Sequence, residues 1–282
     1  MEELTTFLTS IGEEVEDAEE ECFLLFAQDI PSANLGFVDS RATSVDVTIH
    51  GQDYTINQSP TLLSSSRAGG TTGAVLELGC GISGLIALAL SPKITHYIAT
   101  DQEYVHRLLR SNLESNAPSQ HPKSKAGSHR KPSKHGPNNN NNKTAQKSTP
   151  NITFTTLDWE TDDPALLKDS IATNDGNTRR EDRGFDVLIS CDCIYNEALI
   201  APFVRTCADV CRLRAVYGPE KELGDEEMRP TVCVIAQQQR SPEVFEAWLR
   251  ETMRVFRVWR VGDEVLGGSW RLGPGTWCMC WC

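Results

Sequence analysis

Short apolar runs alternate with amphipathic stretches along the chain after residue 70. Residues 74–78 are apolar except for one glutamate and predict a buried strand, and residues 82–90 have the spacing of a helix packed over it. A second strand is predicted at 97–100 and a helix at 103–115. A strand, a glycine turn, a helix and a further strand in this order form a βαβ unit, so we expect a parallel sheet covered by helices.

The same rhythm resumes after an interruption. Further strands are predicted at 152–156, 185–190 and 231–236, and helices at 197–213 and 242–256. This alternation predicts a doubly wound α/β sheet with helices on both faces.

The N-terminal part of the chain has a mixed pattern. Residues 13–28 are rich in Glu and Asp, with amphipathic spacing, and predict a helix. Residues 45–49 and 54–56 alternate around a turn at 51–53, as in a β-hairpin. We therefore divide the chain into a β-containing N-terminal extension at 1–70 and an α/β domain at 71–282.

The interruption at 117–150 is low in complexity. It holds seven Lys or Arg, no Asp or Glu, and a run of five Asn. Such a composition cannot bury enough apolar surface to offset the entropy lost on ordering, so a disordered insertion is predicted. Contact with RNA or with an acidic partner is the alternative role for its positive charge.

Charge narrows the class of partner. The chain carries −12 at pH 7, and outside the insertion 20 basic and 39 acidic residues give −19. An acidic body suits a basic protein better than a nucleic acid, because phosphate binding requires a positive face. Solubility alone is the competing explanation for the acidic charge.

Neither a membrane segment nor a metal site is predicted. No stretch approaches the ~20 apolar residues that span a bilayer, and the first twenty residues are acidic rather than signal-like. The chain has 10 cysteines but no C-x2-C pair of the kind that binds zinc. We expect a cytoplasmic protein, with the nucleus as the second compartment, no metal, and cysteines that act as small buried side chains.

A glycine-rich loop follows the first strand of the α/β domain. Gly79, Gly81 and Gly84 form a G-x-G-x-x-G pattern between a strand and a helix, and Asp101 ends the next strand. Glycine allows a sharp turn and a close approach of a ligand to the backbone, and a carboxylate at the position of Asp101 can accept hydrogen bonds from both ribose hydroxyls. This pattern predicts a cofactor that contains adenosine, and NAD and S-adenosylmethionine both satisfy it.

Residues outside the loop favour S-adenosylmethionine. Glu77 within the first strand could orient the cationic amino group of a methionine moiety. Asp158 and Trp159 follow the third strand, where a carboxylate can accept from the adenine amino group and an indole offers a flat face to the ring. Core packing is the equally weighted alternative for Trp159.

Asp192 and Tyr195 follow the fourth strand. An unpaired charge at a buried strand end is costly, so Asp192 is predicted to have a functional partner such as an incoming amine. The alternative role for Asp192, which lies five residues before residue 197, is to cap the start of the next predicted helix.

These motifs together resemble a known enzyme family. The sequence resembles the S-adenosylmethionine-dependent protein-lysine methyltransferases of the methyltransferase-like 21 family. The resemblance lies in residues 75–81, 100–101 and 157–159 and in the D-x-x-Y motif at 192–195. Residues 58–66, 194–197 and 236–241 are similar to its fungal ribosomal lysine N-methyltransferase 5 branch.

The resemblance implies a Rossmann-like, seven-strand class I methyltransferase fold over 71–282 and a reaction with S-adenosylmethionine as cofactor. It places cofactor contacts at Gly79, Cys80, Gly81, Asp101, Trp159 and Cys191, and it places Asp192 and Tyr195 beside the substrate lysine. The implied substrate is a basic protein, namely a large-subunit ribosomal protein. Direct binding of nucleic acid is not expected.

The sequence departs from the family in two places. Residues 72–75 run directly into residues 76–78, so the segment in which members carry a helix and a cofactor-facing Trp is missing. Residues 273–278 stand where members have an apolar final strand. A binding protein that keeps the fold with impaired catalysis is therefore the alternative function. A methyltransferase of RNA or of a small molecule and an NAD-dependent dehydrogenase fit the motifs less well.

Overall fold

The structure is a computed structural model. It describes residues 2–27, 44–49, 52–57, 73–116, 151–170, 184–214, 230–237, 240–262, 265 and 276–281. The insertion predicted at 117–150 and the segment 58–66 lie outside the described residues.

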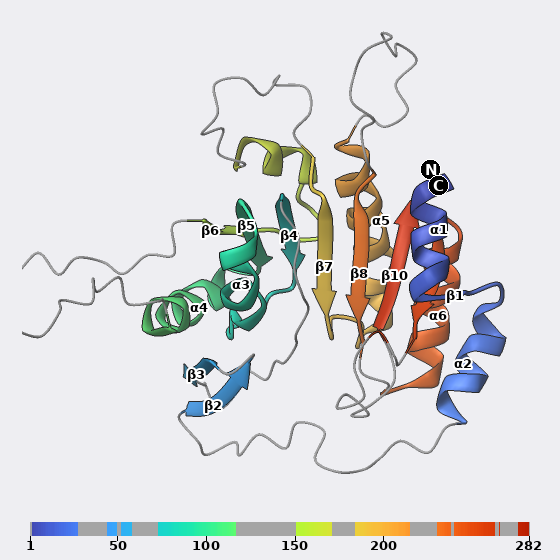
Figure 1. The fold of residues 1–282 in the computed structure, drawn as a ribbon, viewed down its shortest axis with the longest axis horizontal. Coiled ribbons are helices and arrows are strands. Elements are labelled where there is room, and N and C mark those ends of the chain that lie inside the picture. Colours follow the sequence, from blue (N-terminus) through green and yellow to red (C-terminus); the bar gives the residue numbers. More distant parts are fainter. Residues whose placement is uncertain are drawn as a thin grey trace, which may run out of the picture.

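Eight strands form one mixed sheet in the order β1-β9-β10-β8-β7-β4-β5-β6 (Figure 1). The strands β6, β5, β4, β7 and β8 run parallel, whereas β10 is antiparallel to both β8 and β9. Their bounds are β1 Gly12–Glu14, β4 Ala74–Leu78, β5 His96–Asp101, β6 Ile152–Thr156, β7 Val187–Cys191, β8 Val232–Ala236, β9 Phe256–Val261 and β10 Thr276–Trp281. The seven strands from β4 to β10 confirm the Rossmann-like fold predicted from the sequence, and β1 extends the sheet at its far edge.

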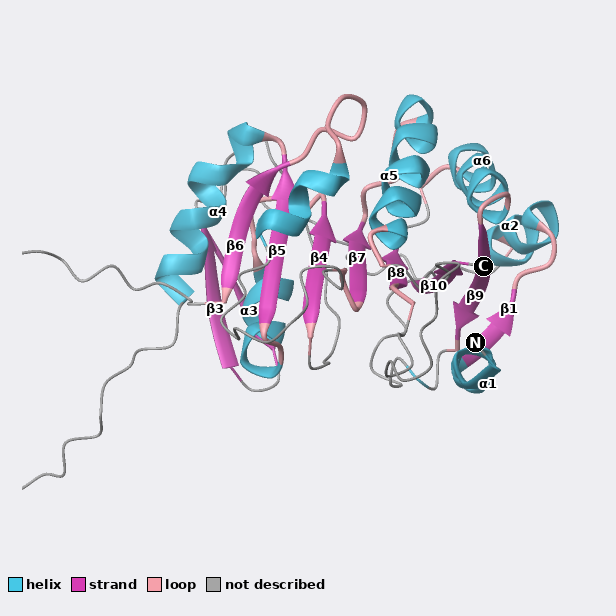
Figure 2. Cartoon of the chain, turned by 90° about the horizontal axis from the view of Figure 1, so that it is seen from above, coloured by secondary structure: helices cyan, strands magenta, loops and turns pink. Residues whose placement is uncertain are grey.

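Helices cover both faces of this sheet (Figure 2). Alternate side chains of a strand point to opposite faces, and the packing follows this rule: Leu76 and Leu78 lie in the same apolar cluster as residues of α2, α5 and α6, whereas Val75 packs with α3 and α4. The helices are α1 Glu2–Ile11, α2 Ala18–Phe26, α3 Leu85–Leu90, α4 Glu103–Asn116, α5 Ile200–Arg212 and α6 Pro242–Met253. None of the described helices is long and apolar enough to cross a bilayer.

The predicted helix at 13–28 is wrong in its first turn. Glu13 and Glu14 lie in β1, where their carboxylates pair with Arg260 and Arg257 of β9 at 2.7 and 2.6 Å. The helix α2 begins only after Asp17, whose side chain accepts hydrogen bonds from two backbone N–H groups of the first turn. A pairing with residues more than 240 positions away overrides the local helical spacing.

The cap of α2 gives a first prediction. We expect Asp17→Ala to lower the free energy of unfolding by about 1 kcal/mol, because two N–H groups of α2 lose their acceptor. Glu16→Ala, at the exposed neighbouring position, is the matched control and is expected to change stability by much less. Urea unfolding of the two variants measures the difference, and equal stabilities would show that the cap contributes nothing.

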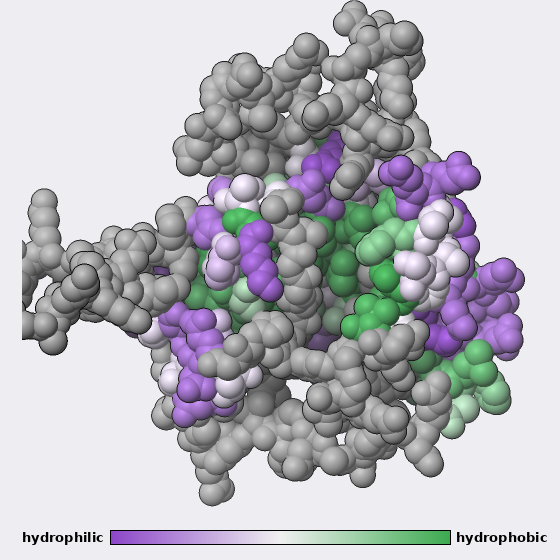
Figure 3. Space-filling model, in the orientation of Figure 1, coloured by the Kyte–Doolittle hydropathy of each residue, from purple (hydrophilic) through white to green (hydrophobic). Residues whose placement is uncertain are grey.

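The outer side of α2 carries exposed apolar side chains. Phe23 is 72% and Leu24 45% exposed, and part of the surface at this helix, at the lower right of Figure 3, is coloured as hydrophobic. Cys22 and Leu25 of the same helix point inward and join the core. The helix therefore has apolar residues on both its inner and its outer side.

The predicted hairpin is confirmed as a separate two-stranded sheet. Its strands are β2 Ser44–Ile49 and β3 Gln52–Asn57, so Gln52 and Asp53 belong to a strand rather than to the turn. Asn116 at the end of α4 holds it by two hydrogen bonds, from Thr55 N to Asn116 Oδ1 at 2.8 Å and from Asn116 Nδ2 to Thr55 O at 2.9 Å.

Several predicted helix bounds differ from the structure. The helix predicted at 82–90 begins at Leu85, because Gly84 before it has a left-handed φ of 61°. A short 3-10 turn, Glu197–Leu199, precedes α5. The helix predicted to reach residue 256 ends at Met253, and Phe256 begins the strand β9, which was not predicted.

The sequence departs less from the family that it resembles at the C-terminal end than was expected. Residues 276–281 form β10, which pairs with both β8 and β9, so a final strand is present.

Candidate functional site

A cavity of about 430 Å³ opens at the carboxyl ends of β4, β5, β6 and β7. The strand order changes direction between β4 and β7, and ligands of doubly wound sheets bind at this kind of switch point. The volume suits a small molecule of cofactor size. Of the eight site residues that the family resemblance implies, seven line this pocket: Gly79, Gly81, Asp101, Trp159, Cys191, Asp192 and Tyr195.

The glycine loop is braced by Asp101. Gly79 and Gly81 have left-handed φ values of 66° and 59°, and a Cβ on Gly79 would collide with the thiol of Cys193. Gly81 N donates to Asp101 Oδ2 at 2.7 Å, and Gln102 N donates to Asp101 Oδ1 at 2.7 Å. Because each carboxylate oxygen can accept more than one hydrogen bond, Asp101 keeps acceptor capacity toward the pocket.

The environment of Asp101 acts on its ionisation in two opposing ways. Burial raises the pKa of this carboxyl group, and the two backbone hydrogen bonds partly offset the rise. The same N–H groups that shape the loop therefore stabilise the carboxylate form that can accept from hydroxyl groups.

Cys80 lies behind the loop instead of in the pocket wall. Its backbone N–H donates to Thr100 O at 3.0 Å, and its side chain is buried. Burial is also the largest cause that raises the pKa of its thiol well above the usual value. The structure thus gives Cys80 a packing position beneath the glycine turn.

Glu77 was expected to face the cofactor, and this expectation is wrong. The side chain is buried in the sheet, outside the pocket lining, and its Oε2 accepts a hydrogen bond of 2.7 Å from the Tyr97 hydroxyl. Burial raises the pKa of Glu77 to about 7, an effect that the Tyr97 hydrogen bond opposes and the charge of Asp101 reinforces.

The raised pKa of Glu77 makes stability depend on pH. Between its usual pKa of 4.5 and about 7 the folded state holds the Glu77 proton while the unfolded state has lost it. Stability therefore falls as the pH rises through this interval, by up to about 1.4 kcal/mol per pH unit, and levels off above it. We expect Glu77→Gln, which keeps an acceptor for Tyr97, to remove this pH-dependent part of the free energy of unfolding. Urea unfolding at pH 5, 6, 7 and 8 measures it. An unchanged pH profile in the variant would contradict the assignment.

Core packing of Trp159 is confirmed, whereas its contact with an adenine ring stays a prediction. Its ring packs edge-on against Phe203 of α5, with centroids 5.1 Å apart, and it also lines the pocket. Arg205 Nη2 donates to the Trp159 carbonyl at 2.8 Å, so the segment after β6 is tied to α5. Asp158 lines the pocket beside it, and its Oδ1 accepts from Glu160 N at 2.9 Å.

Asp192 already has protein partners. Its backbone has a left-handed φ of 56°, which Asp tolerates better than most residues. One carboxylate oxygen pairs with Arg240, and the other accepts from Gln237 Nε2 at 3.3 Å. The helix-cap alternative is wrong, because the side chain of Asn196 caps the following turn by accepting from Ala198 N at 3.0 Å.

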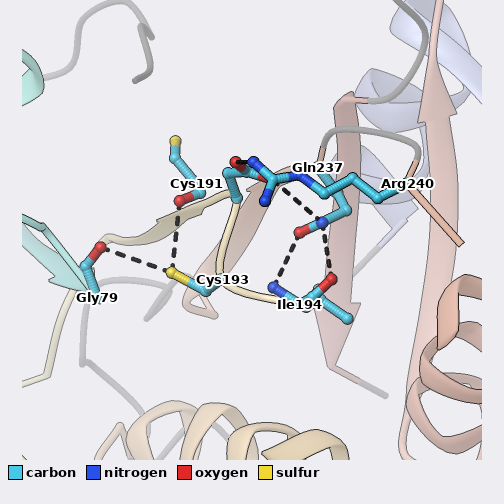
Figure 4. A network of polar contacts seen from close by, with 7 residues as sticks. Gly79, Cys191, Cys193, Ile194, Gln237 and Arg240 are labelled. Atoms are coloured by element: carbon cyan, nitrogen blue, oxygen red, sulfur yellow. Dashed lines mark hydrogen bonds and ion pairs between the residues drawn. The ribbon is translucent and has the colours of Figure 1, made fainter. Parts of the chain in front are cut away.

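Gln237 fixes the loop that carries the D-x-x-Y motif. It accepts from Ile194 N at 3.0 Å and donates to Ile194 O at 2.8 Å, and in Figure 4 it reaches this loop from the end of β8. Tyr195, next to Ile194, is 62% exposed and stands at the pocket rim. The amide of Gln237 thus sets the position of a motif on the neighbouring strand end.

Cys193 is a buried packing residue. Its Sγ lies 3.5 Å from Gly79 O and 3.4 Å from Cys191 O (Figure 4), and burial raises the pKa of its thiol to about 12. A thiol with such a pKa is a poor nucleophile at neutral pH. The seven cysteines whose side chains the structure describes are free thiols, and the described residues contain no cluster of three or more His, Cys, Asp or Glu that could hold a metal.

Among the pocket residues that were given no role from the sequence, two stand out. Tyr104, in the first turn of α4, lines the pocket with an exposed side chain, and Arg240 lies just beyond β8. Arg240 could have been found from the topology, because the ends of neighbouring parallel strands meet at one edge and Asp192 requires a counter-charge there.

Comparisons with known proteins give partial similarities. No family model matches the chain. It is 27% identical over 196 residues to "Ribosomal lysine N-methyltransferase 5" of Zygosaccharomyces rouxii, and this match covers 68% of this chain and 54% of that protein. It is 32% identical over 131 residues to "Diaminohydroxyphosphoribosylamino-pyrimidine deaminase" of Schizosaccharomyces pombe, and this match covers 36% of this chain and 32% of that protein. The chain thus spans about half and about a third of the lengths of these two relatives.

Similar solved structures include the "delta-N METTL16 MTase domain", with a TM-score of 0.37, 13% identity and coverage of 75% of this chain and 72% of that chain. Spermidine synthase from Thermotoga maritima has a TM-score of 0.35 and 11% identity, and the match covers 85% of this chain and 72% of that chain. Both scores are below 0.5, so the fold of this chain rests on its own strand order.

Proposed function

We propose that this chain is an S-adenosylmethionine-dependent protein-lysine N-methyltransferase. The observation that carries the proposal is one pocket that joins two sets of residues. The braced glycine loop and Asp101 form one side, and Asp192 and Tyr195 of the D-x-x-Y motif lie on the adjacent strand end. The partial similarity to a relative named as a ribosomal lysine N-methyltransferase supports the same function.

The pocket fits an adenosine-containing cofactor. Gly79 and Gly81, both with left-handed φ values, carry no side chain, so a ligand can approach the backbone at these two positions. Asp101 would accept from the ribose hydroxyls, and Trp159 would offer its ring to the base, with Cys191 also in the wall. S-adenosylmethionine supplies an electrophilic methyl group when bound.

The residues of this chain would bind and orient the lysine. Asp192 attracts the cationic side chain to the pocket, and Tyr195 at the rim directs the amine inward. Entry into a pocket partly lined by apolar side chains favours the neutral amine, which is the nucleophile in an in-line displacement. Alignment of the reacting atoms supplies the main rate effect, since proximity contributes up to about 7–11 kcal/mol in model reactions.

The substrate proposed is a lysine of a large-subunit ribosomal protein, methylated in the cytoplasm. The net charge of −12 favours a basic protein partner over a nucleic acid, and the name of the relative from Zygosaccharomyces rouxii points to the ribosome.

A methyltransferase-fold binding protein with impaired catalysis is the second candidate. The observation in its favour is that Arg240 and Gln237 already occupy the carboxylate of Asp192. Calorimetric titration of the purified chain with S-adenosylmethionine separates the two candidates. We expect one binding site per chain, whereas a folded protein that releases no heat of binding would favour the impaired binding protein.

A further inference from the structure

We propose that Arg240 selects the substrate by occupying the position of the lysine cation on Asp192 until the lysine displaces it. This inference rests on the proposed function and adds a specificity-determining residue to it. The mouth of the pocket thus carries an internal cation, supplied from the end of β8, opposite the carboxylate at the end of β7.

The contacts place Arg240 on the carboxylate that a lysine would approach. Arg240 lines the pocket, and its Nη2 pairs with Oδ2 of Asp192, while Gln237 holds Oδ1. In Figure 4 the side chain of Arg240 extends from beyond β8 toward the loop after β7. A second cation on this carboxylate therefore shares an oxygen with Arg240 or Gln237, or takes the place of Arg240 on Oδ2.

Burial differs between the two partners. The side chain of Asp192 is only 18% exposed, and its backbone N–H donates to Ala236 O at 2.7 Å, so the carboxylate is fixed. The side chain of Arg240 is 52% exposed, so the guanidinium can move into solvent. Displacement moves the arginine and leaves the aspartate in place.

The pair is weak enough to be displaced. Ion pairs with a half-exposed partner change an equilibrium by up to about fivefold, because solvent screens them and ordering two side chains costs entropy. A cation that also buries its methylene chain in the pocket can exceed this, whereas a hydrated sodium ion gains no such burial. The competition thus favours a long amine over small cations.

The test removes the internal cation without changing the carboxylate. We expect Arg240→Gln to lower the KM for a lysine-containing ribosomal protein about two- to fivefold with kcat unchanged. Arg240→Lys, which keeps the charge, should stay close to wild type. Arg212→Gln is the matched control, because Arg212 is also 52% exposed and pairs with an aspartate, Asp209, away from the pocket. An unchanged or raised KM in Arg240→Gln would overturn the inference.

A binding experiment keeps the inference separate from the proposed function. Titration of the wild-type protein with n-butylammonium, followed by the side-chain Nε–H signal of Arg240 in ¹H–¹⁵N NMR, is expected to shift this signal, and Arg240→Gln should bind the amine more tightly. If the signal moves but no lysine is methylated by any variant, Arg240 competition stands and the methyltransferase proposal falls. If lysine is methylated but the amine binds without moving the Arg240 signal, the competition falls and the proposed function stands.

Discussion

Replacing Asp192 with asparagine is expected to lower kcat/KM for methyl transfer to lysine by about 100-fold, the loss associated with a reacting group that is misplaced by about 1 Å. The substitution keeps the shape of the side chain and tolerates the left-handed φ of 56°. It removes the charge that attracts the lysine ammonium, and it weakens the pairing with Arg240. Binding of S-adenosylmethionine should change little, since Asp101 and Trp159, the proposed contacts to the ribose and the base, lie on other strand ends.

The matched control for this variant is Asp209→Asn. Asp209 also pairs with an arginine, but it lies on α5, away from the pocket lining. Initial rates with a labelled methyl donor would compare both variants with wild type. A rate in Asp192→Asn within about twofold of wild type would contradict a role for this carboxylate in orienting the amine.

Asp101→Asn is expected to weaken the binding of S-adenosylmethionine at least tenfold. Asp101 is the acceptor proposed for the ribose hydroxyls, and a hydrogen bond to a charged group contributes about 1.5–3 kcal/mol, where about 1.4 kcal/mol corresponds to tenfold in affinity. The amide also puts a donor group beside Gly81 N or Gln102 N, both of which now donate to the carboxylate, so the loop would lose part of its brace.

Calorimetry measures this loss directly. Asp163→Asn is the control, because the side chain of Asp163 also accepts from a backbone N–H, that of Ala165 at 2.9 Å, and lies outside the pocket lining. Equal affinities of wild type and Asp101→Asn would remove Asp101 from the cofactor site.

The central strands were predictable because each is short, apolar and followed by turn residues. The strands at 74–78 and 152–156 match the structure, and the other three parallel strands differ by one or two residues. The prediction failed where distant residues decide the structure. Glu13 and Glu14 form a strand because Arg260 and Arg257 lie beside them, and β9 went unpredicted because these same arginines interrupt its apolar pattern.

The site was predictable to the extent that it follows the strand ends. Parallel topology brings strand ends to one edge, and the site residues lie at or shortly after these ends: Gly79, Asp101, Trp159 and Asp192. The direction of a side chain within a strand was not predictable in the same way. Glu77 turns toward Tyr97 in the core, and the partner of Asp192 comes from Arg240, 48 residues further along the chain.

The central claim is tested most directly by the chemical identity of the product. The purified chain would be incubated with S-adenosylmethionine labelled in its methyl group and with ribosomal proteins, and the digested proteins would be analysed by mass spectrometry. We predict label on the side-chain nitrogen of a lysine, and its loss with Asp192→Asn. A folded chain that binds S-adenosylmethionine but leaves every lysine unlabelled would contradict the claim.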